Sequence, residues 1–231
     1  MNKNKVLAYP NQQRMKLKIS IISLGLLLLG HLNKHNPIPP FSISKQASAI
    51  NVRTAILEKF HLGYKRLWVD SLWLATLLES DLEHYKKKDL NSWMYLRFQT
   101  ISTLDPAFLT LYEYAGIYLS IIKNDIQGSI QILKKGLEFY PESFELNFNL
   151  GFNYFFELQQ PEKALPFFDK IKFYPKAPLY LTTLVAKIKM KQGDKQSALK
   201  LIKEASDKMP PGSAGKKYYL NYLENFEKKS N

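Results

Sequence analysis

FELNFNLGFNYFFELQQPEKALPFFDKIKFYP, residues 144–175, holds two amphipathic patterns in succession. In its first half apolar residues recur every four positions, at Leu146, Leu150 and Tyr154. In its second half the spacing is four and then three, at Ala164, Phe168 and Ile171. Each spacing places its residues on one face of a helix. The turn at 159–161 separates the halves and Pro175 closes the second, so the stretch predicts a pair of short helices.

The same pattern returns along the chain. Four prolines follow one another at intervals of 35, 34 and 35 residues: Pro106, Pro141, Pro175 and Pro210. Small or apolar residues with the four-then-three spacing precede each of them: Met94, Phe98 and Ile101; Ser129, Leu133 and Gly136; Ala164, Phe168 and Ile171; Ala198, Ile202 and Ala205. Because proline interrupts a helix interior, each one marks the end of a unit. A period in this range is typical of architectures in which similar units stack.

The first helix and the turn of each unit also recur. The motif Leu150-Gly151-x-x-Tyr154 lies 35 residues after Ala115-Gly116-x-x-Leu119, and Leu62-Gly63 takes the corresponding place near the start. Short polar turns separate the two helices of a unit, at 123–125, 159–161 and 192–194. We expect Asp125 and Asp194 to cap the helices that follow, and Pro161 to occupy a first helical turn.

These features resemble the tetratricopeptide repeat family: a small residue before an aromatic one, Leu-Gly-x-x-Tyr, a Gly-Asp turn and a closing proline. The resemblance covers about residues 57–210 and is close in QGDKQSALKLIKEA, residues 192–205. It implies an all-α fold, a right-handed superhelix of antiparallel helix pairs with a C-terminal capping helix. Two departures stand out. Asn147 and Thr182 replace the early aromatic residue that Tyr112 supplies, and the turns of the second and third units carry one extra residue relative to the family.

The first unit is the least regular. LGYKRLWVDSLWLATL, residues 62–77, is apolar almost all round, so we expect a buried and extra-long first helix, with Asp70 paired to Arg66 one turn away. This segment also resembles the opening helix of bacterial membrane-anchored tetratricopeptide proteins.

The N-terminus suggests a membrane. Residues 1–35 carry six basic residues and no acidic one, and the apolar run 19–32 follows most of them. Positive charge before an apolar run is typical of an anchor or an export signal. The run is shorter than the roughly 20 residues of a spanning helix. The only Ala-x-Ala sequence, the usual form of a signal cleavage site, is at 47–49, well beyond the apolar run. An uncleaved short anchor is therefore favoured over a cleaved signal. A start at Met15 would give a compact export leader.

The chain therefore divides into five predicted segments: a basic segment 1–18, an anchor or signal 19–32, a tether 33–50, a repeat array of about four units 51–210, and a capping helix with tail 211–231. In the last segment Tyr219, Leu220, Leu223 and Phe226 would form the apolar face. The net charge of +13 is concentrated at the two ends. Without a recognisable readout motif, binding to nucleic acid is not expected.

Two hypotheses about function remain. The first is a membrane-associated adaptor that binds a segment of a partner protein in its concave groove, on residues from the first helices: Glu113, Ile117, Phe148, Asn149, Phe152, Phe155, Thr183 and Lys187. The second is a structural subunit of a cell-envelope assembly, whose repeats serve oligomerisation. No catalytic motif, cofactor site or metal site is predicted, and the chain has no cysteine. The expected location is a bacterial inner membrane with the repeats on the periplasmic side, or, after cleavage, a soluble exported form.

Overall fold

The computed structural model describes residues 9–35, 44–46, 49, 57–59 and 61–228. These residues form helices and no strand, which confirms the all-α class for the described part of the chain. The chain divides into two compact units, Met1–Ile43 and Ser44–Asn231. The second unit begins within the predicted tether, since Ala49 is buried in its core and Lys45 bonds to Asp81.

The first unit contains one described helix, α1 (Tyr9–His35), and the predicted anchor lies within it. Its apolar side chains are exposed where they are described, from Ile19 to Leu28. No helix of the described residues, α1 included, has the length and apolar character needed to cross a membrane, in contrast to the expected transmembrane anchor.

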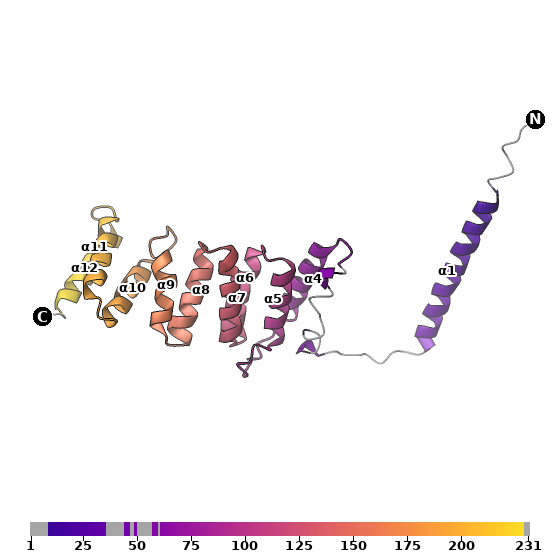
Figure 1. Ribbon diagram of the computed structural model, residues 1–231, viewed down its shortest axis with the longest axis horizontal. Helices are drawn as coiled ribbons and strands as arrows, with labels where there is room; N and C mark the ends of the chain where they lie inside the picture. Colours follow the sequence, from indigo (N-terminus) through magenta and orange to yellow (C-terminus); the bar gives the residue numbers. More distant parts are fainter. Residues whose placement is uncertain (1–8, 36–43, 47–48, 50–56, 60, 229–231) are drawn as a thin grey trace, which may run out of the picture. The chain divides into compact units, whose positions relative to one another are not determined.

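The second unit is a row of helices that follow one another in sequence order (Figure 1). Its elements are α4 (Lys65–Leu78), α5 (Trp93–Leu104), α6 (Leu109–Ile117) with η1 (Tyr118–Ile122), α7 (Ile126–Phe139), α8 (Phe144–Phe152) with η2 (Asn153–Glu157), α9 (Pro161–Ile171), α10 (Leu179–Lys191), α11 (Lys195–Asp207) and α12 (Ala214–Lys228). Each helix packs on the next, and α6 also contacts α8, so the packing is local along the chain. We call α4, α6, α8 and α10 the first helices of their pairs.

The core confirms the helix faces predicted from the sequence. Every residue of the four second-helix sets is buried, from Met94 on α5 to Ala205 on α11. Leu146, Leu150 and Tyr154 of the third unit are buried as well. The spacing of four and three therefore identified the inward side of these helices correctly.

Glycine allows the two helices of a pair to approach closely. A Cβ atom on Gly116 would lie 2.6 Å from Leu133, and one on Gly151 would lie 2.5 Å from Phe168. Gly151 lies 35 residues after Gly116, and Phe168 lies 35 residues after Leu133. The same contact between a glycine and a large side chain is thus made in two successive units.

The extra residue in the turns of the second and third units is taken up by the helix before each turn. The first helices of these units end in the five-residue π-helical turns η1 and η2. Equivalent bonds close them, from Lys123 N to Tyr118 O at 2.9 Å and from Leu158 N to Asn153 O at 3.0 Å. A π turn accommodates one more residue than an α turn, which lets the next helix keep its register.

The predicted helix starts are confirmed. The Asp125 carboxylate accepts from Gly128 N at 3.0 Å, and that of Asp194 accepts from Ser197 N at 3.1 Å. Pro161 is the first residue of α9. These caps satisfy backbone N–H groups that have no partner within the helix.

The first unit differs from its prediction. Its first helix, α4, is not extra-long but ends at Leu78, where the charged and polar residues 79–92 follow. Nor is α4 buried all round, because only Val69 and Thr76 are buried while Leu67 and Leu74 are exposed. Among the described helices, α4 packs on α5 through the side that carries Val69 and Thr76. Asp70 and Arg66 are also exposed, and no ion pair between them is found among the described residues.

At the other end α12 forms as predicted and packs on α11 and α10. Tyr219 is buried, and its hydroxyl donates to Leu179 O at 3.2 Å. Leu223 is partly buried, but Leu220 is exposed, so its assignment to the apolar face is wrong. The side chain of Phe226 lies outside the described residues.

Candidate functional site: an exposed face of the first helices

Three successive first helices present the same four positions at the surface, each exposed or partly exposed. On each helix these positions are spaced by four, three and four residues, and corresponding residues lie 35 apart: Thr110, Tyr114, Ile117 and Ile121; Glu145, Asn149, Phe152 and Phe156; Tyr180, Leu184, Lys187 and Lys191. We call these twelve residues the first-helix face. The spacing keeps each set of four on one side of its helix, opposite the buried residues.

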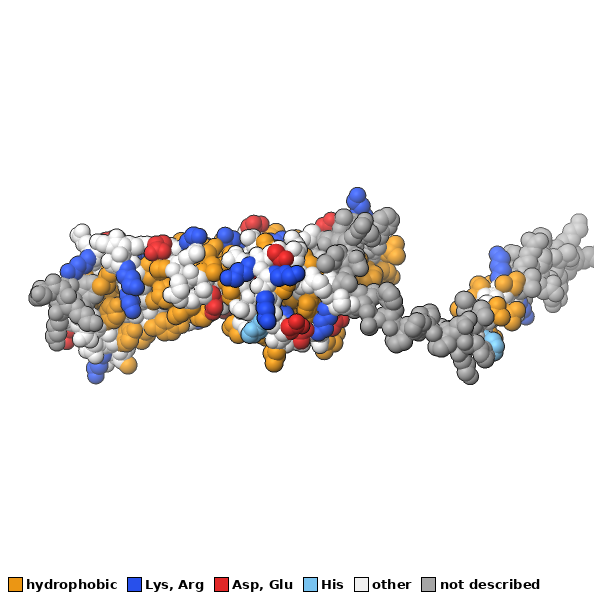
Figure 2. Space-filling model, turned by 90° about the horizontal axis from the view of Figure 1, so that it is seen from below, with side chains coloured by type: hydrophobic (Ala, Val, Ile, Leu, Met, Phe, Trp, Pro, Cys, Tyr) orange, Lys and Arg blue, Asp and Glu red, His pale blue; other side chains and the backbone are white. Residues whose placement is uncertain are grey.

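Large apolar side chains are exposed on this face. Ile117, Phe156, Tyr114, Tyr180 and Ile121 are between 41% and 65% exposed. Figure 2 shows that, on the side of the array drawn there, hydrophobic side chains reach the surface between lysines and acidic residues. Scattered exposed apolar residues are ordinary in proteins, but five large ones gathered on the same face of successive helices are typical of an interaction surface.

An aromatic cluster supports the middle of the face. Phe148 and Phe155 pack on the buried Phe168, with ring centroids 6.1 and 6.3 Å apart. Phe156 lies 4.7 Å from both Phe155 and Phe152 by the same measure. Phe148 and Phe155 are therefore mainly packing residues, whereas Phe152 and Phe156 bring the cluster to the surface.

A pocket of about 450 Å³ opens beside the N-terminal ends of α6 and α8, and its lining includes Glu113, Phe144, Glu145, Tyr174 and Lys176. Lys176 forms an ion pair with Glu145 and lies 5.2 Å from the ring centroid of Phe144. Burial, together with the charge of Glu145, raises the pKa of Glu113, and Lys176 opposes this shift. The pocket thus combines an aromatic wall with a carboxyl group that is protonated more readily than usual.

The α10 part of the face is basic. Lys187 is exposed, as is Lys191 one turn further on. Thr183, by contrast, is buried: its hydroxyl donates to Tyr180 O at 2.9 Å and lies 3.1 Å from the Tyr218 hydroxyl of α12. Thr183 is covered by the C-terminal helix and does not belong to the exposed face, contrary to its predicted role.

The predicted site residues separate into two groups. Ile117, Asn149, Phe152 and Lys187 lie on the first-helix face, while the other four predicted residues lie beside it: Glu113, Phe148, Phe155 and Thr183. Four large exposed members were missed: Tyr114, Ile121, Phe156 and Tyr180. The helical spacing would have found them. Steps of three and four residues from Ile117, Phe152 and Lys187, which lie 35 apart, lead to every other position of the face.

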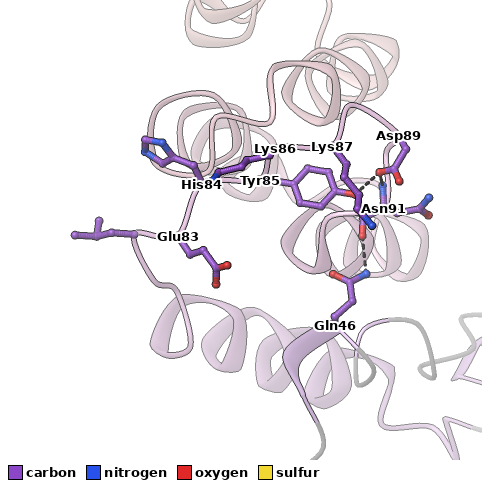
Figure 3. Close-up of a pocket in the computed structure, with 9 residues that line it drawn as sticks. Gln46, Glu83, His84, Tyr85, Lys86, Lys87, Asp89 and Asn91 are labelled. Carbon is purple, nitrogen blue, oxygen red and sulfur yellow. Dashed lines mark hydrogen bonds between the residues drawn. The ribbon is translucent and has the colours of Figure 1, made fainter.

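A second, larger pocket of about 980 Å³ lies at residues 79–92, the connection between α4 and α5. Figure 3 shows Tyr85 pointing toward Asp89 and His84 pointing the other way. Gln46 closes one side by donating to Asn91 O at 2.6 Å. The described residues bring together no group of His, Asp and Glu that could hold a metal ion, here or elsewhere.

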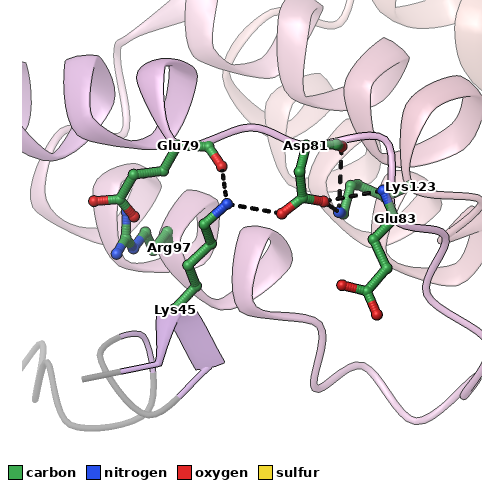
Figure 4. Close-up of polar contacts among 6 residues, drawn as sticks. All are labelled: Lys45, Glu79, Asp81, Glu83, Arg97 and Lys123. Carbon is green, nitrogen blue, oxygen red and sulfur yellow. Dashed lines mark hydrogen bonds and ion pairs between the residues drawn. The ribbon is translucent and has the colours of Figure 1, made fainter. Parts of the chain in front are cut away.

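Ion pairs hold this connection to the array. Asp81 is paired with Lys45 at 2.8 Å on one side and with the buried Lys123 on the other (Figure 4). Burial would raise the pKa of Asp81, but the hydrogen bonds from Lys123 and Lys45 outweigh it and lower the pKa to about 2. Arg97 pairs with Glu79 at 2.6 Å.

The same cations surround one buried ring. Lys45, Arg97 and Lys123 lie 5.4, 5.2 and 5.6 Å from the ring centroid of Trp93. Because a tryptophan face attracts cations, the ring and the two carboxylates together fix their positions. We call Glu79, Asp81, Lys45, Arg97, Lys123 and Trp93 the polar cluster; its paired charges and buried ring indicate a structural role.

The chain was also compared with known proteins. No family model matches it, and no curated protein sequence matches it.

Proposed function

We propose that this chain is a membrane-associated scaffold of the tetratricopeptide type, which holds a segment of a partner protein against its first-helix face. The observation that carries the proposal is the exposure of large apolar side chains on the same face of successive first helices: Tyr114, Ile117 and Ile121, then Phe156, then Tyr180. Burying them against a partner would be favourable by about 25 cal/mol for each Å² of apolar surface removed from water.

Four observations support the repeat type. Successive units keep an offset of 35 residues in their exposed positions, in their glycine contacts and in their π-helical turns. The helices contact mainly their neighbours along the chain, as stacked repeats do. In this proposal α4 to α11 form antiparallel pairs that stack into a right-handed superhelix, and α12 caps its last pair.

The chemistry of the face suggests the chemistry of the partner. Apolar residues such as Ile117 and Ile121 dominate on α6 and η1, whereas Lys187 and Lys191 stand at the equivalent positions of α10. A matching ligand is an amphipathic segment with apolar residues at helical spacing and acidic residues at the end that lies over α10. Lysine and arginine are not required in it, because the apolar part of the face offers them no acceptor.

Membrane attachment is the second part of the proposal. It is supported by the basic residues Lys16 and Lys18 directly before the exposed apolar side chains of α1, a combination that binds anionic membrane surfaces. We propose that the array lies on the periplasmic side of a bacterial inner membrane. Fractionation tests this part: the full chain should sediment with membranes, and Leu24→Asp with Leu27→Asp should release it.

The partner proposal is tested by site-specific photo-crosslinking in the native cell. A photoreactive residue at Ile117 should give crosslinks to a small set of proteins. The same residue at Gln131, which is exposed on α7 away from the face, should not. Crosslinks from Ile117 should disappear when Phe156→Asp is added, and mass spectrometry should map them to an amphipathic segment. Identical crosslinks at both positions, or crosslinks that survive Phe156→Asp, would show that the face binds no partner.

A further inference from the structure

A second apolar surface lies on α4. Leu67, Leu74 and Leu78 are 63%, 56% and 76% exposed and line up along one side of the helix with Ser71 between them. We call these four residues the α4 stripe. Val69 and Thr76, on the opposite side, are buried against the array. The stripe is therefore an apolar helix face without a partner among the described residues.

The spacing within the stripe is that of a helix–helix seam. Its residues follow one another at intervals of four, three and four, which is the a/d pattern of a heptad repeat. A seam of this kind is narrow and packs against another helix, whereas a bilayer surface suits a broader apolar face. Asp70 borders the stripe and is exposed, which further disfavours burial in lipid.

The two ends of the row of helices differ in chemistry. Trp68 of α4 is 45% exposed, whereas Leu111 near the start of α6 is fully buried. At the other end α12 turns Lys217, Asn221 and Glu224 to the solvent. Terminal elements of a stacked array usually have such a polar outer side. Among the described residues, the α4 end instead exposes the stripe and Trp68, so it does not match the polar α12 end of another copy.

We propose that α4 packs in antiparallel orientation against α4 of a second copy of this chain, forming a two-fold symmetric dimer. This inference does not rest on the proposed function, because it uses the α4 stripe and not the first-helix face. An isologous contact of this kind is closed, so it stops at the dimer and leaves both α12 ends free.

Side-chain sizes favour the antiparallel orientation. The stripe is centred between Leu72 and Trp73, so Ser71 faces Leu74 of the second copy, and Leu67 faces its Leu78. Each facing pair then includes at least one leucine, which fills the space between the two helices. A parallel pairing would set Ser71 against its own copy and leave that layer underfilled.

Charge favours the same orientation. Lys65 and Arg66 stand exposed at the start of α4, and the exposed Glu83 follows its end, whereas Glu79 is already paired with Arg97 of the same chain. Antiparallel pairing brings the basic start of one helix beside the acidic end of the other, and it opposes the two helix dipoles. A parallel pair would bring like charges together at both ends.

The absence of cysteine from the chain makes the register testable by single substitutions in the full-length protein. In the antiparallel dimer, Ser71→Cys should form a disulfide with its own copy, because the two positions are offset by only three residues, about 4.5 Å along the axis. Leu67→Cys and Leu78→Cys should not crosslink alone, since each is offset from its copy by about 16 Å. Mixed together, these two variants should crosslink. Gln196→Cys, on the exposed side of α11, is the matched control and should remain monomeric.

Sedimentation equilibrium of the full chain gives an independent measurement. Leu74→Glu should raise the dimer dissociation constant by about tenfold or more, without lowering the unfolding temperature at protein concentrations where the wild type is monomeric. Ile121→Glu changes an exposed residue of the first-helix face; it should leave the dimer intact while removing partner crosslinks. The two variants therefore distinguish failure of the dimer proposal from failure of the proposed partner binding at the first-helix face.

Four results would overturn the inference. The first is a chain that stays monomeric at every concentration, and the second is Leu67→Cys crosslinking to itself as efficiently as Ser71→Cys. The third is unfolding of the Leu74→Glu variant, which is expected if a segment of the same chain covers the stripe. The fourth is self-association that is lost in Ile121→Glu but kept in Leu74→Glu.

Discussion

The middle of the array and its N-terminal end are built differently. From α6 to α9, equivalent residues lie 35 apart and have equivalent environments, as Leu133 and Phe168 do beside their glycines. At α4 the interval is lost, although α5 keeps it. Apolar side chains of α4 such as Leu74 are exposed, and the polar cluster holds the connection 79–92 in place. Apolar packing fixes the middle, while ion pairs and a buried tryptophan fix the end.

The difference follows from the number of neighbours. A helix in the middle has partners before and after it, so a residue such as Leu150 is enclosed from several directions. α4 has described partners on one side only, and a similar apolar sequence therefore leaves half of its surface exposed. In a stacked array, sequence determines which face is apolar, and position in the row determines how much of it is buried.

The largest effect is expected from one substitution made in both regions. Leu150→Ala, at a fully buried position of α8, should lower the free energy of unfolding by about 2–5 kcal/mol, through lost apolar contacts and the cavity left behind. Leu74→Ala, on the exposed side of α4, should change it by about 0.5 kcal/mol or less in the monomer. Urea unfolding of the full chain at low protein concentration measures both.

Protein concentration sharpens this comparison. If the α4 stripe forms a dimer, the effect of Leu74→Ala should grow as concentration rises, because dimerisation stabilises the native state. The effect of Leu150→Ala should not. Equal losses from the two substitutions at low concentration would show that α4 is enclosed as fully as α8.

A smaller effect is expected from the close contact within the third unit. Replacing glycine by alanine inside a helix normally stabilises it by about 0.5–1 kcal/mol. Gly151→Ala should do the opposite and destabilise by about 1–3 kcal/mol, because the new methyl group would meet the Phe168 ring. Asn149→Ala, on the exposed side of the same helix, is the control and should change stability little. A stabilising Gly151→Ala would mean that the two helices are packed less closely than the structure indicates.

Much of the fold could be predicted from the sequence, for a physical reason. Proline, helix caps and the spacing of apolar residues act locally, so Pro161, Asp125 and the second-helix faces were identified correctly. The predictions that were wrong concern burial that depends on neighbouring helices, which the sequence of one helix does not reveal. The exposure of Leu67 and the burial of Thr183 under α12 are of this kind.

The candidate site could be predicted only in part. Ile117, Phe152 and Lys187 follow from the repeat interval. From the sequence alone, Phe148 and Phe155 are equally good candidates for the exposed face, but in the structure their rings pack on the buried Phe168. Phe155 and Phe156 are adjacent within η2, yet Phe155 packs on Phe168 while Phe156 is exposed to solvent.

The smallest effect is expected at the polar cluster, and it depends on pH. The pKa of Asp81 is about 2, against an ordinary value of 3.8. A carboxylate with a lowered folded pKa stabilises the native state above its unfolded pKa, and this contribution is lost as the pH falls from about 4 toward 2. Asp81→Asn should therefore reduce stability near neutral pH by about 1 kcal/mol or less, since the group is partly exposed to solvent.

The difference between the wild type and Asp81→Asn should shrink as urea unfolding is repeated from pH 6 down to pH 2. Asp207→Asn, which removes an exposed carboxylate from α11, controls for the change in net charge and should give a difference that stays nearly constant. If Asp81→Asn also gave a constant difference, its ion pairs with Lys45 and Lys123 would not stabilise this end of the array. Trp93 and the apolar contacts of α5 would then hold the end in place, by the same kind of packing that holds the middle.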